Sequence, residues 1–137
     1  MERGELGRGV ETIRRGEEGV NSEDLRRGLT TAEVETLRQQ AWIGDAVLEL
    51  YARTLVLDQT RRRDVDRKIR FVRNAFLNHL GQPTRVEAEI GRCYRDGGLD
   101  TAFAWIERNI EPLFLKQEAN LARKEKQHLP GKRLRQR

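Results

Sequence analysis

The longest nearly continuous apolar run covers residues 42–57, in a chain that is otherwise very polar. Apolar side chains recur every three or four positions along this part of the chain and form a wide helical stripe. Thr30 and Glu33 have the spacing of a capping box, in which each side chain binds a backbone N–H group of the other residue. The pattern predicts a long core helix over about residues 31–57.

Four further helical segments follow from the same periodicity. Apolar residues spaced by three or four predict one helix over residues 65–80. Thr84 can cap the next helix, whose apolar face is formed by Val86, Ile90, Cys93 and Tyr94. Gly97 and Gly98 are expected to end that helix, since glycine tolerates the left-handed backbone of a helix C-terminus.

Another helix is expected from Asp100 to about residue 110, and a last one after Pro112. No segment alternates between apolar and polar residues as a strand does, so the sequence predicts an all-α helical bundle. At 137 residues the chain forms a single domain. We expect a flexible polar segment at 1–29, the helical domain at 30–122 and a basic tail at 123–137.

Positive charge is concentrated in two stretches. The net charge is +5, and residues 61–73 hold seven Lys or Arg and two acids, while residues 123–137 hold seven and one. Such patches suggest a polyanionic partner, nucleic acid first, although a solvated tail and helix face fit the charge equally well. The candidate RNA-binding residues are Arg61, Arg62, Arg63, Arg67, Lys68, Lys132, Arg133, Arg135 and Arg137.

Several classes of chemistry and location are disfavoured. The chain has one cysteine, two histidines and one serine, which argues against disulfides, a zinc centre and a serine nucleophile. Carboxylates and hard cations remain as candidates for chemistry. The chain has neither an apolar run of about 20 residues nor an apolar signal region, so we expect a soluble cytoplasmic protein without membrane contact.

Gly44 and Asp45 interrupt the best core helix, because glycine weakens a helix interior and a charge is costly to bury. Asp45, Glu49 and Arg53 share one helix face. This face is either a solvated seam with a Glu49–Arg53 ion pair or the lining of a cleft. Residues that break the local pattern in a core helix are candidates for a functional site.

Two acidic segments stand out in the sequence. The first, at residues 43–50, reads Ile-Gly-Asp-Ala-Val-Leu-Glu-Leu. The second, at residues 86–91, reads Val-Glu-Ala-Glu-Ile-Gly and is followed by Tyr-Arg-Asp-Gly-Gly-Leu at 94–99. Together they resemble the catalytic domain of ribonuclease III, most closely the short form, Mini-ribonuclease III, and the first is similar to the signature helix of that family. The likeness covers roughly residues 34–115.

This resemblance implies a ribonuclease III-like endonuclease domain that forms a homodimer and acts on double-stranded or structured RNA. It implies an Mg²⁺-dependent endoribonuclease of the rRNA-processing type, with Mn²⁺ as the alternative cofactor. Asp45 and Glu87 match the family's catalytic metal ligands. Glu49, one turn after Asp45, either helps to orient these ligands without contacting the metal or forms an ion pair with Arg53.

The chain also departs from the family pattern. Ala41 and Thr84 stand where full-length members carry further carboxylates, and the middle is shortened. We expect no double-stranded-RNA-binding domain after the core. Glu89, Arg92 and Arg95 occupy positions that are apolar in family members, and we expect them to face water. The alternatives are a catalytically inactive RNA-binding or ribosome-associated relative, and a helical protein-interaction domain.

Overall fold

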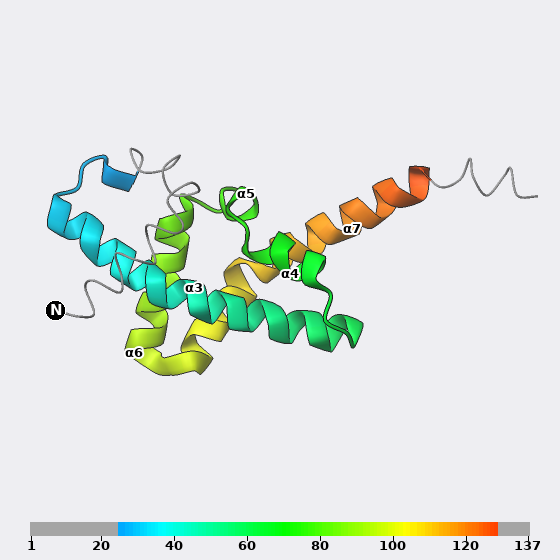
Figure 1. Ribbon diagram of the computed structural model, residues 1–137, viewed down its shortest axis with the longest axis horizontal. Helices are drawn as coiled ribbons and strands as arrows, with labels where there is room; N and C mark the ends of the chain where they lie inside the picture. Colours follow the sequence, from blue (N-terminus) through cyan, green and yellow to red (C-terminus); the bar gives the residue numbers. More distant parts are fainter. Residues whose placement is uncertain (1–24, 129–137) are drawn as a thin grey trace, which may run out of the picture.

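The structure is a computed structural model that describes residues 25–128, and every regular element within this range is helical. The five labelled helices are α3 (Thr31–Thr60), α4 (Val65–Val72), α5 (Asn74–Leu77), α6 (Pro83–Asn109) and α7 (Glu111–His128). Figure 1 shows them in chain order. The all-α prediction is confirmed for this part of the chain.

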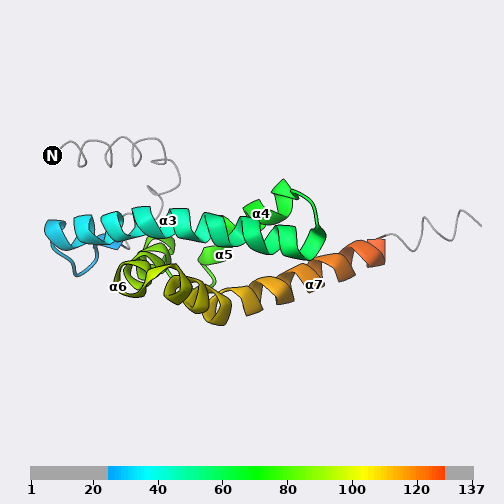
Figure 2. The ribbon, with the colours of Figure 1, turned by 90° about the horizontal axis from the view of Figure 1, so that it is seen from below.

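The fold is organised around α3, which packs mainly against α6. In Figure 1 the first half of α6 crosses α3, and in Figure 2 the later part of α6 and the start of α7 run beneath it. The last turns of α7 extend beyond the other helices in both views. Helix α3 therefore contributes to the packing along most of its length.

The predicted capping box starts α3. The Thr30 hydroxyl accepts a hydrogen bond from the Glu33 backbone N–H at 3.1 Å, and Glu33 accepts one from the Thr30 N–H at 2.8 Å. These bonds satisfy backbone donors that the first helical turn leaves without partners. The helix continues to Thr60, one turn further than predicted.

The core contains a cluster of aromatic rings from α4, α5 and α7. Phe71 lies 4.7 Å from Phe114 and 6.0 Å from Phe76, measured between ring centroids. All three rings are at most 3% exposed. Burial of such rings supplies much of the hydrophobic stabilisation in a domain of this size.

The prediction of one helix over residues 65–80 is wrong. The backbone at Arg73 is extended (φ −74°, ψ 151°), and this break separates α4 from α5. Phe76 and Leu77 are adjacent in sequence, yet both are almost fully buried. A change of direction between Phe71 and these residues lets all three side chains reach the core, so tertiary packing overrides the helical periodicity.

Helix α6 starts and bends at residues with clear local causes. Gln82, not Thr84, caps it by accepting a hydrogen bond from the Arg85 N–H, and Pro83 occupies the first turn. Gly98 has φ +85°, which interrupts the helix at the predicted glycine pair. Tyr94 was predicted to face inward but is 40% exposed.

The charged side of α6 agrees with its prediction. Arg92 and Arg95 are exposed and Glu89 is partly exposed, as expected for residues that face water. Arg92 forms ion pairs with Glu89 and with Asp96. Charged residues therefore cover this side of α6 instead of a packed helix.

The folded part begins before residue 30. Leu25, assigned to the flexible N-terminal segment, is only 2% exposed. At the other end, α7 runs to His128 and so includes the first residues of the predicted basic tail. The remaining residues of these two predicted segments, 1–24 and 129–137, lie outside the described range.

Candidate functional site

The two segments that resemble ribonuclease III meet where α3 crosses α6. A methyl carbon placed on Gly44 would lie 1.7 Å from the backbone oxygen of Glu87 and 2.8 Å from the backbone nitrogen of Gly91. A methyl carbon on Gly91 would lie 1.9 Å from the backbone oxygen of Gln40. Only glycine fits at either position, because these neighbours are backbone atoms that cannot rotate away. The two helices thus approach backbone to backbone at Gly44 and Gly91.

This crossing brings together the parts of the chain that carry the two candidate metal ligands. Asp45 follows Gly44, and Glu87 is the residue whose backbone contacts Gly44. Glu87 is 3% exposed, whereas Asp45 is partly exposed. Across residues 25–128, no three His, Cys, Asp or Glu side chains come together as a metal-binding group. The backbone at Gly44, next to Asp45, therefore lies against the backbone of Glu87, and no larger acidic cluster forms among the described residues.

The positions where further carboxylates were expected are packed. Ala41 is 6% exposed and Thr84 is 8% exposed, and they lie on the same two helices, close to the crossing in sequence. A carboxylate at such a buried position would need a partner charge or an ion. The small neutral side chains found here remove that requirement, and they leave Asp45 and Glu87 as the candidate ligands.

Glu49 pairs with basic residues. Its carboxylate contacts Arg53 at 2.6 Å and Lys68 at 2.9 Å, so it connects α3 to α4. Partial burial acts to raise the pKa of Glu49, but the hydrogen bonds and charges of Lys68 and Arg53 outweigh it and lower this pKa. Of the two predicted roles, the contacts show the pairing with Arg53 and add Lys68, which sequence spacing did not suggest.

A groove of about 900 Å³ lies between the end of α3 and the start of α4. Its cationic lining residues are Arg53, Arg61, Arg62, Arg63 and Lys68, and its apolar lining includes Val56, Leu57 and Val65. Asp64 is the one carboxylate in the lining, and it pairs with Arg62 at 3.3 Å. We call this feature the basic groove. Its charge and size suit a polyanion.

The candidate RNA-binding residues differ in their availability. Arg61, Arg62 and Arg63 are exposed, and neither Arg61 nor Arg63 forms an ion pair with another residue of 25–128. Lys68 lies in the groove but is held by Glu49. Arg67 binds Glu118 of α7 at 2.7 Å and also Gln59, so it contributes to the fold. The four tail candidates Lys132, Arg133, Arg135 and Arg137 lie outside the described residues.

Arg61 adopts an unusual backbone conformation. Its φ is +60° and ψ is 20°, and its N–H donates to the Leu57 carbonyl as the C-cap of α3. Glycine is the usual residue at such a left-handed cap, since a side chain there costs roughly 1–2 kcal/mol. An arginine held in this conformation beside a basic groove is a candidate functional residue.

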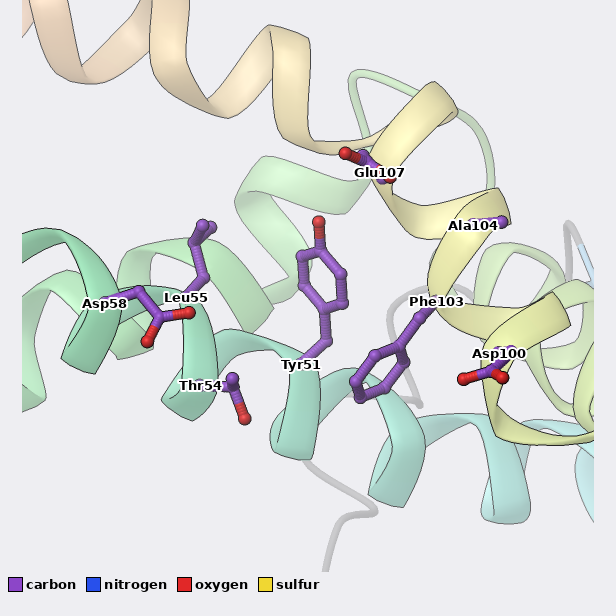
Figure 3. Close-up of a pocket in the computed structure, with 8 residues that line it drawn as sticks. All are labelled: Tyr51, Thr54, Leu55, Asp58, Asp100, Phe103, Ala104 and Glu107. Carbon is purple, nitrogen blue, oxygen red and sulfur yellow. The ribbon is translucent and has the colours of Figure 1, made fainter.

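A second hollow, of about 350 Å³, lies between α3 and the later half of α6. Figure 3 shows Tyr51 and Phe103 near its centre, with Asp58, Asp100 and Glu107 around it. The Tyr51 hydroxyl donates a hydrogen bond to Glu111, and the ring meets Phe103 edge-on at 5.0 Å. Burial and Glu111 raise the pKa of Tyr51. Tyr51 therefore remains a neutral donor that connects α3 to the start of α7.

Three features of the site were not predicted. Gly91 completes the helix crossing, and a glycine one turn after Glu87 was the available signal for it. Arg53 and the exposed Leu57 line the basic groove, and their positions eight and four residues before Arg61 were the available signal for this shared helix face. The bridge from Glu49 to Lys68 joins two helices and has no signal in local spacing.

No protein-family model matches the chain, and comparisons with curated proteins and with solved structures also find no match. The likeness to ribonuclease III therefore rests on the residues quoted above. Within residues 25–128, no helix combines the length and apolar character that crossing a membrane requires.

Proposed function

We propose that this chain is a ribonuclease III-like endoribonuclease that binds double-stranded or structured RNA and cleaves it with Mg²⁺. The crossing of α3 and α6 at Gly44 and Gly91 carries the proposal, because it brings the backbones beside Asp45 and Glu87 together. Cleavage of duplex RNA that requires both Mg²⁺ and Asp45 tests it.

The candidate ligands fit the proposed ion. Mg²⁺ prefers oxygen ligands and is commonly bound through one or two carboxylates, while water and substrate phosphate complete its coordination. Asp45 and Glu87 supply two carboxylates, and Mn²⁺ is the natural alternative ion. When bound, the ion would polarise the scissile phosphate and make a nearby water more acidic.

The protein residues would position the RNA. Arg61, Arg62 and Arg63 would bind phosphates of the RNA backbone. These contacts would give affinity that does not depend on the RNA sequence. Arg53 and Lys68 keep Glu49 ionised and hold α3 against α4 on one side of the groove. The exposed apolar residues Leu57 and Val65 line the same groove.

Replacing Arg61 by glycine separates RNA binding from stability. Glycine accepts the left-handed backbone, so we expect Arg61→Gly to retain or raise the free energy of unfolding, by up to about 1 kcal/mol. Combined with Arg63→Gln, it should weaken duplex-RNA binding and reduce the slope of log affinity against log salt by roughly 1.5–2. Fluorescence anisotropy over a salt series measures both quantities.

The matched control is the Arg61→Lys, Arg63→Lys double variant, which keeps both charges and should keep the salt slope. An unchanged slope in the Arg61→Gly, Arg63→Gln variant would show that RNA does not contact this groove. A slope that falls equally in both double variants would point to a change in fold, which urea unfolding would detect.

We also propose that the chain forms a homodimer through α3. Trp42, Leu50 and Leu57 are 39%, 47% and 46% exposed, and their spacings of eight and seven residues place them on one helix face. A row of exposed large apolar side chains is typical of a protein interface. This face ends at the basic groove, because Leu57 also lines that groove.

Leu50→Glu should convert the dimer to a monomer, because it places a charge in the proposed interface while Leu50 is exposed enough for the fold to tolerate it. Light scattering coupled to size-exclusion chromatography measures the mass. Leu115→Glu is the control, since Leu115 is 39% exposed but belongs to α7. A monomeric mass for the unmutated chain at micromolar concentration would contradict the proposal.

A non-catalytic RNA-binding or ribosome-associated protein is the second candidate. It is favoured by the buried neutral residues Ala41 and Thr84 and by the lack of a larger metal-binding group within residues 25–128. RNA binding that depends on Arg61 and Arg63, without cleavage under any divalent cation, is the outcome expected of this second candidate.

A further inference from the structure

A smaller groove, of about 340 Å³, lies between the α4–α5 region and α7. Its polar lining includes Arg70, Arg73, His79, Asn120 and Lys124, with Phe114 at its buried floor. Arg70 and Lys68 lie two residues apart on the short helix α4 and line different grooves. We call this feature the α7 groove. Its volume lies at the lower end of the range for small-molecule sites.

The one carboxylate that lines the α7 groove is already neutralised. Glu118 accepts hydrogen bonds from Arg67 at 2.7 Å and from Arg70 at 2.6 and 2.8 Å. The Glu118 side chain is only 10% exposed, and hydrogen bonding to Glu118 raises the pKa of Arg70. Two guanidinium groups on one carboxylate leave a surplus of positive charge, and they fix the position of α4 against α7.

Two further cationic side chains border the groove, and neither is paired with a carboxylate of residues 25–128. Arg73 and Lys124 are both exposed, and neither forms an ion pair with another residue of 25–128. They come from opposite sides, Arg73 from the break between α4 and α5 and Lys124 from α7. The break that ends α4 is thus also the feature that brings Arg73 to the rim.

We propose that the α7 groove is a phosphate-binding site that takes a terminal phosphate monoester, carried by a nucleotide or by the end of an RNA strand. Arg73 and Lys124 contact the phosphate from the two sides, and the side-chain amide of Asn120 and the imidazole of His79 are available as further donors. The groove is too small for a duplex, so the ligand is a single nucleotide unit. Phosphate prefers such charged, convergent donors.

The test measures binding by isothermal titration calorimetry with the full chain and three probes. These are a nucleoside 5′-monophosphate, a short single-stranded RNA with a 5′-phosphate, and the same RNA with a 5′-hydroxyl. We expect at least one phosphate monoester to bind, and we expect the 5′-hydroxyl RNA to bind at least about tenfold more weakly than its phosphorylated form. Binding of the mononucleotide identifies a free nucleotide as a sufficient ligand, while binding of the phosphorylated RNA alone identifies the strand end.

The Arg73→Gln, Lys124→Gln double variant should lose this binding by about tenfold or more. Arg108→Gln, Lys116→Gln is the control with the same change in net charge, and it should retain binding because neither residue lines the groove. Equal affinity for phosphorylated and hydroxyl-ended RNA without mononucleotide binding, or equal losses in both double variants, would overturn the proposal. None of these outcomes depends on RNA cleavage or on the basic groove.

Discussion

Gly44→Ala is expected to lower the free energy of unfolding by about 3 kcal/mol or more. The added methyl carbon would lie 1.7 Å from the Glu87 backbone oxygen, and no side-chain rotation can relieve that overlap. The chain must instead separate α3 from α6, which form the main helix contact of the fold. Since small domains are stable by only about 5–15 kcal/mol, this loss is large. Urea unfolding followed by circular dichroism measures it.

Gly91→Ala should have a similar effect, because its methyl carbon would lie 1.9 Å from the Gln40 backbone oxygen. Separating the two helices relieves both overlaps, so the double variant should lose less stability than the sum of the single losses. Ala46→Ser, at an exposed position of α3, is the control and should change stability by less than about 0.5 kcal/mol. Unfolding of Gly44→Ala at the same urea concentration as the unmutated chain would refute the backbone contact.

Asp45→Asn and Glu87→Gln are each expected to reduce Mg²⁺-dependent cleavage of duplex RNA by more than about 100-fold, since the loss of a residue that merely supports a metal ligand already costs about 10–100-fold. Each substitution keeps the shape of the side chain and removes its charge. RNA affinity should be maintained, because the arginines of the basic groove are untouched. Single-turnover cleavage and anisotropy measure the two effects separately.

Two conservative substitutions serve as controls for these carboxylates. Asp58→Asn changes an exposed carboxylate on α3, and Glu89→Gln changes a partly exposed one two residues from Glu87. Both should cleave RNA at nearly the unmutated rate. Cleavage that survives in Asp45→Asn, or that is lost equally in Asp58→Asn, would remove Asp45 from the proposed metal site.

Much of the fold could be predicted because its causes are local. The capping box at Thr30 and Glu33, the helical stripe of α3 and the interruption at Gly98 each depend on residues close in sequence. The exposure of Arg92 and Arg95 was likewise predictable, since they and Glu89 are charged residues spaced by three along one side of α6. Local patterns therefore located most of the helices.

The errors arise where distant parts of the chain decide the outcome. The break at Arg73 turns Phe76 and Leu77 toward a core that also contains Phe114 of α7, and no local pattern encodes that contact. Thr84 has the side chain of a helix cap, yet Gln82 caps α6 and Thr84 is buried. Helix propensity and periodicity describe single segments and do not report such contacts.

The candidate site was predictable in part. Gly44 and Asp45 stood out because they break the pattern of a core helix, and the tight contact at Gly44 agrees with the close packing that such a glycine permits. The role of Gly91 and the bridge from Glu49 to Lys68 required the arrangement of helices in space. Residues that break the pattern of a core helix therefore indicated the candidate site, while the crossing of α3 and α6 determines which residues lie together there.

The most direct test of the central claim is single-turnover cleavage of a duplex RNA by the unmutated chain, at protein concentrations that saturate RNA binding, with Mg²⁺ and with excess chelator. We predict defined cleavage products with Mg²⁺ and none with the chelator. Intact RNA in both conditions, with binding verified in the same samples, would contradict the proposed endoribonuclease.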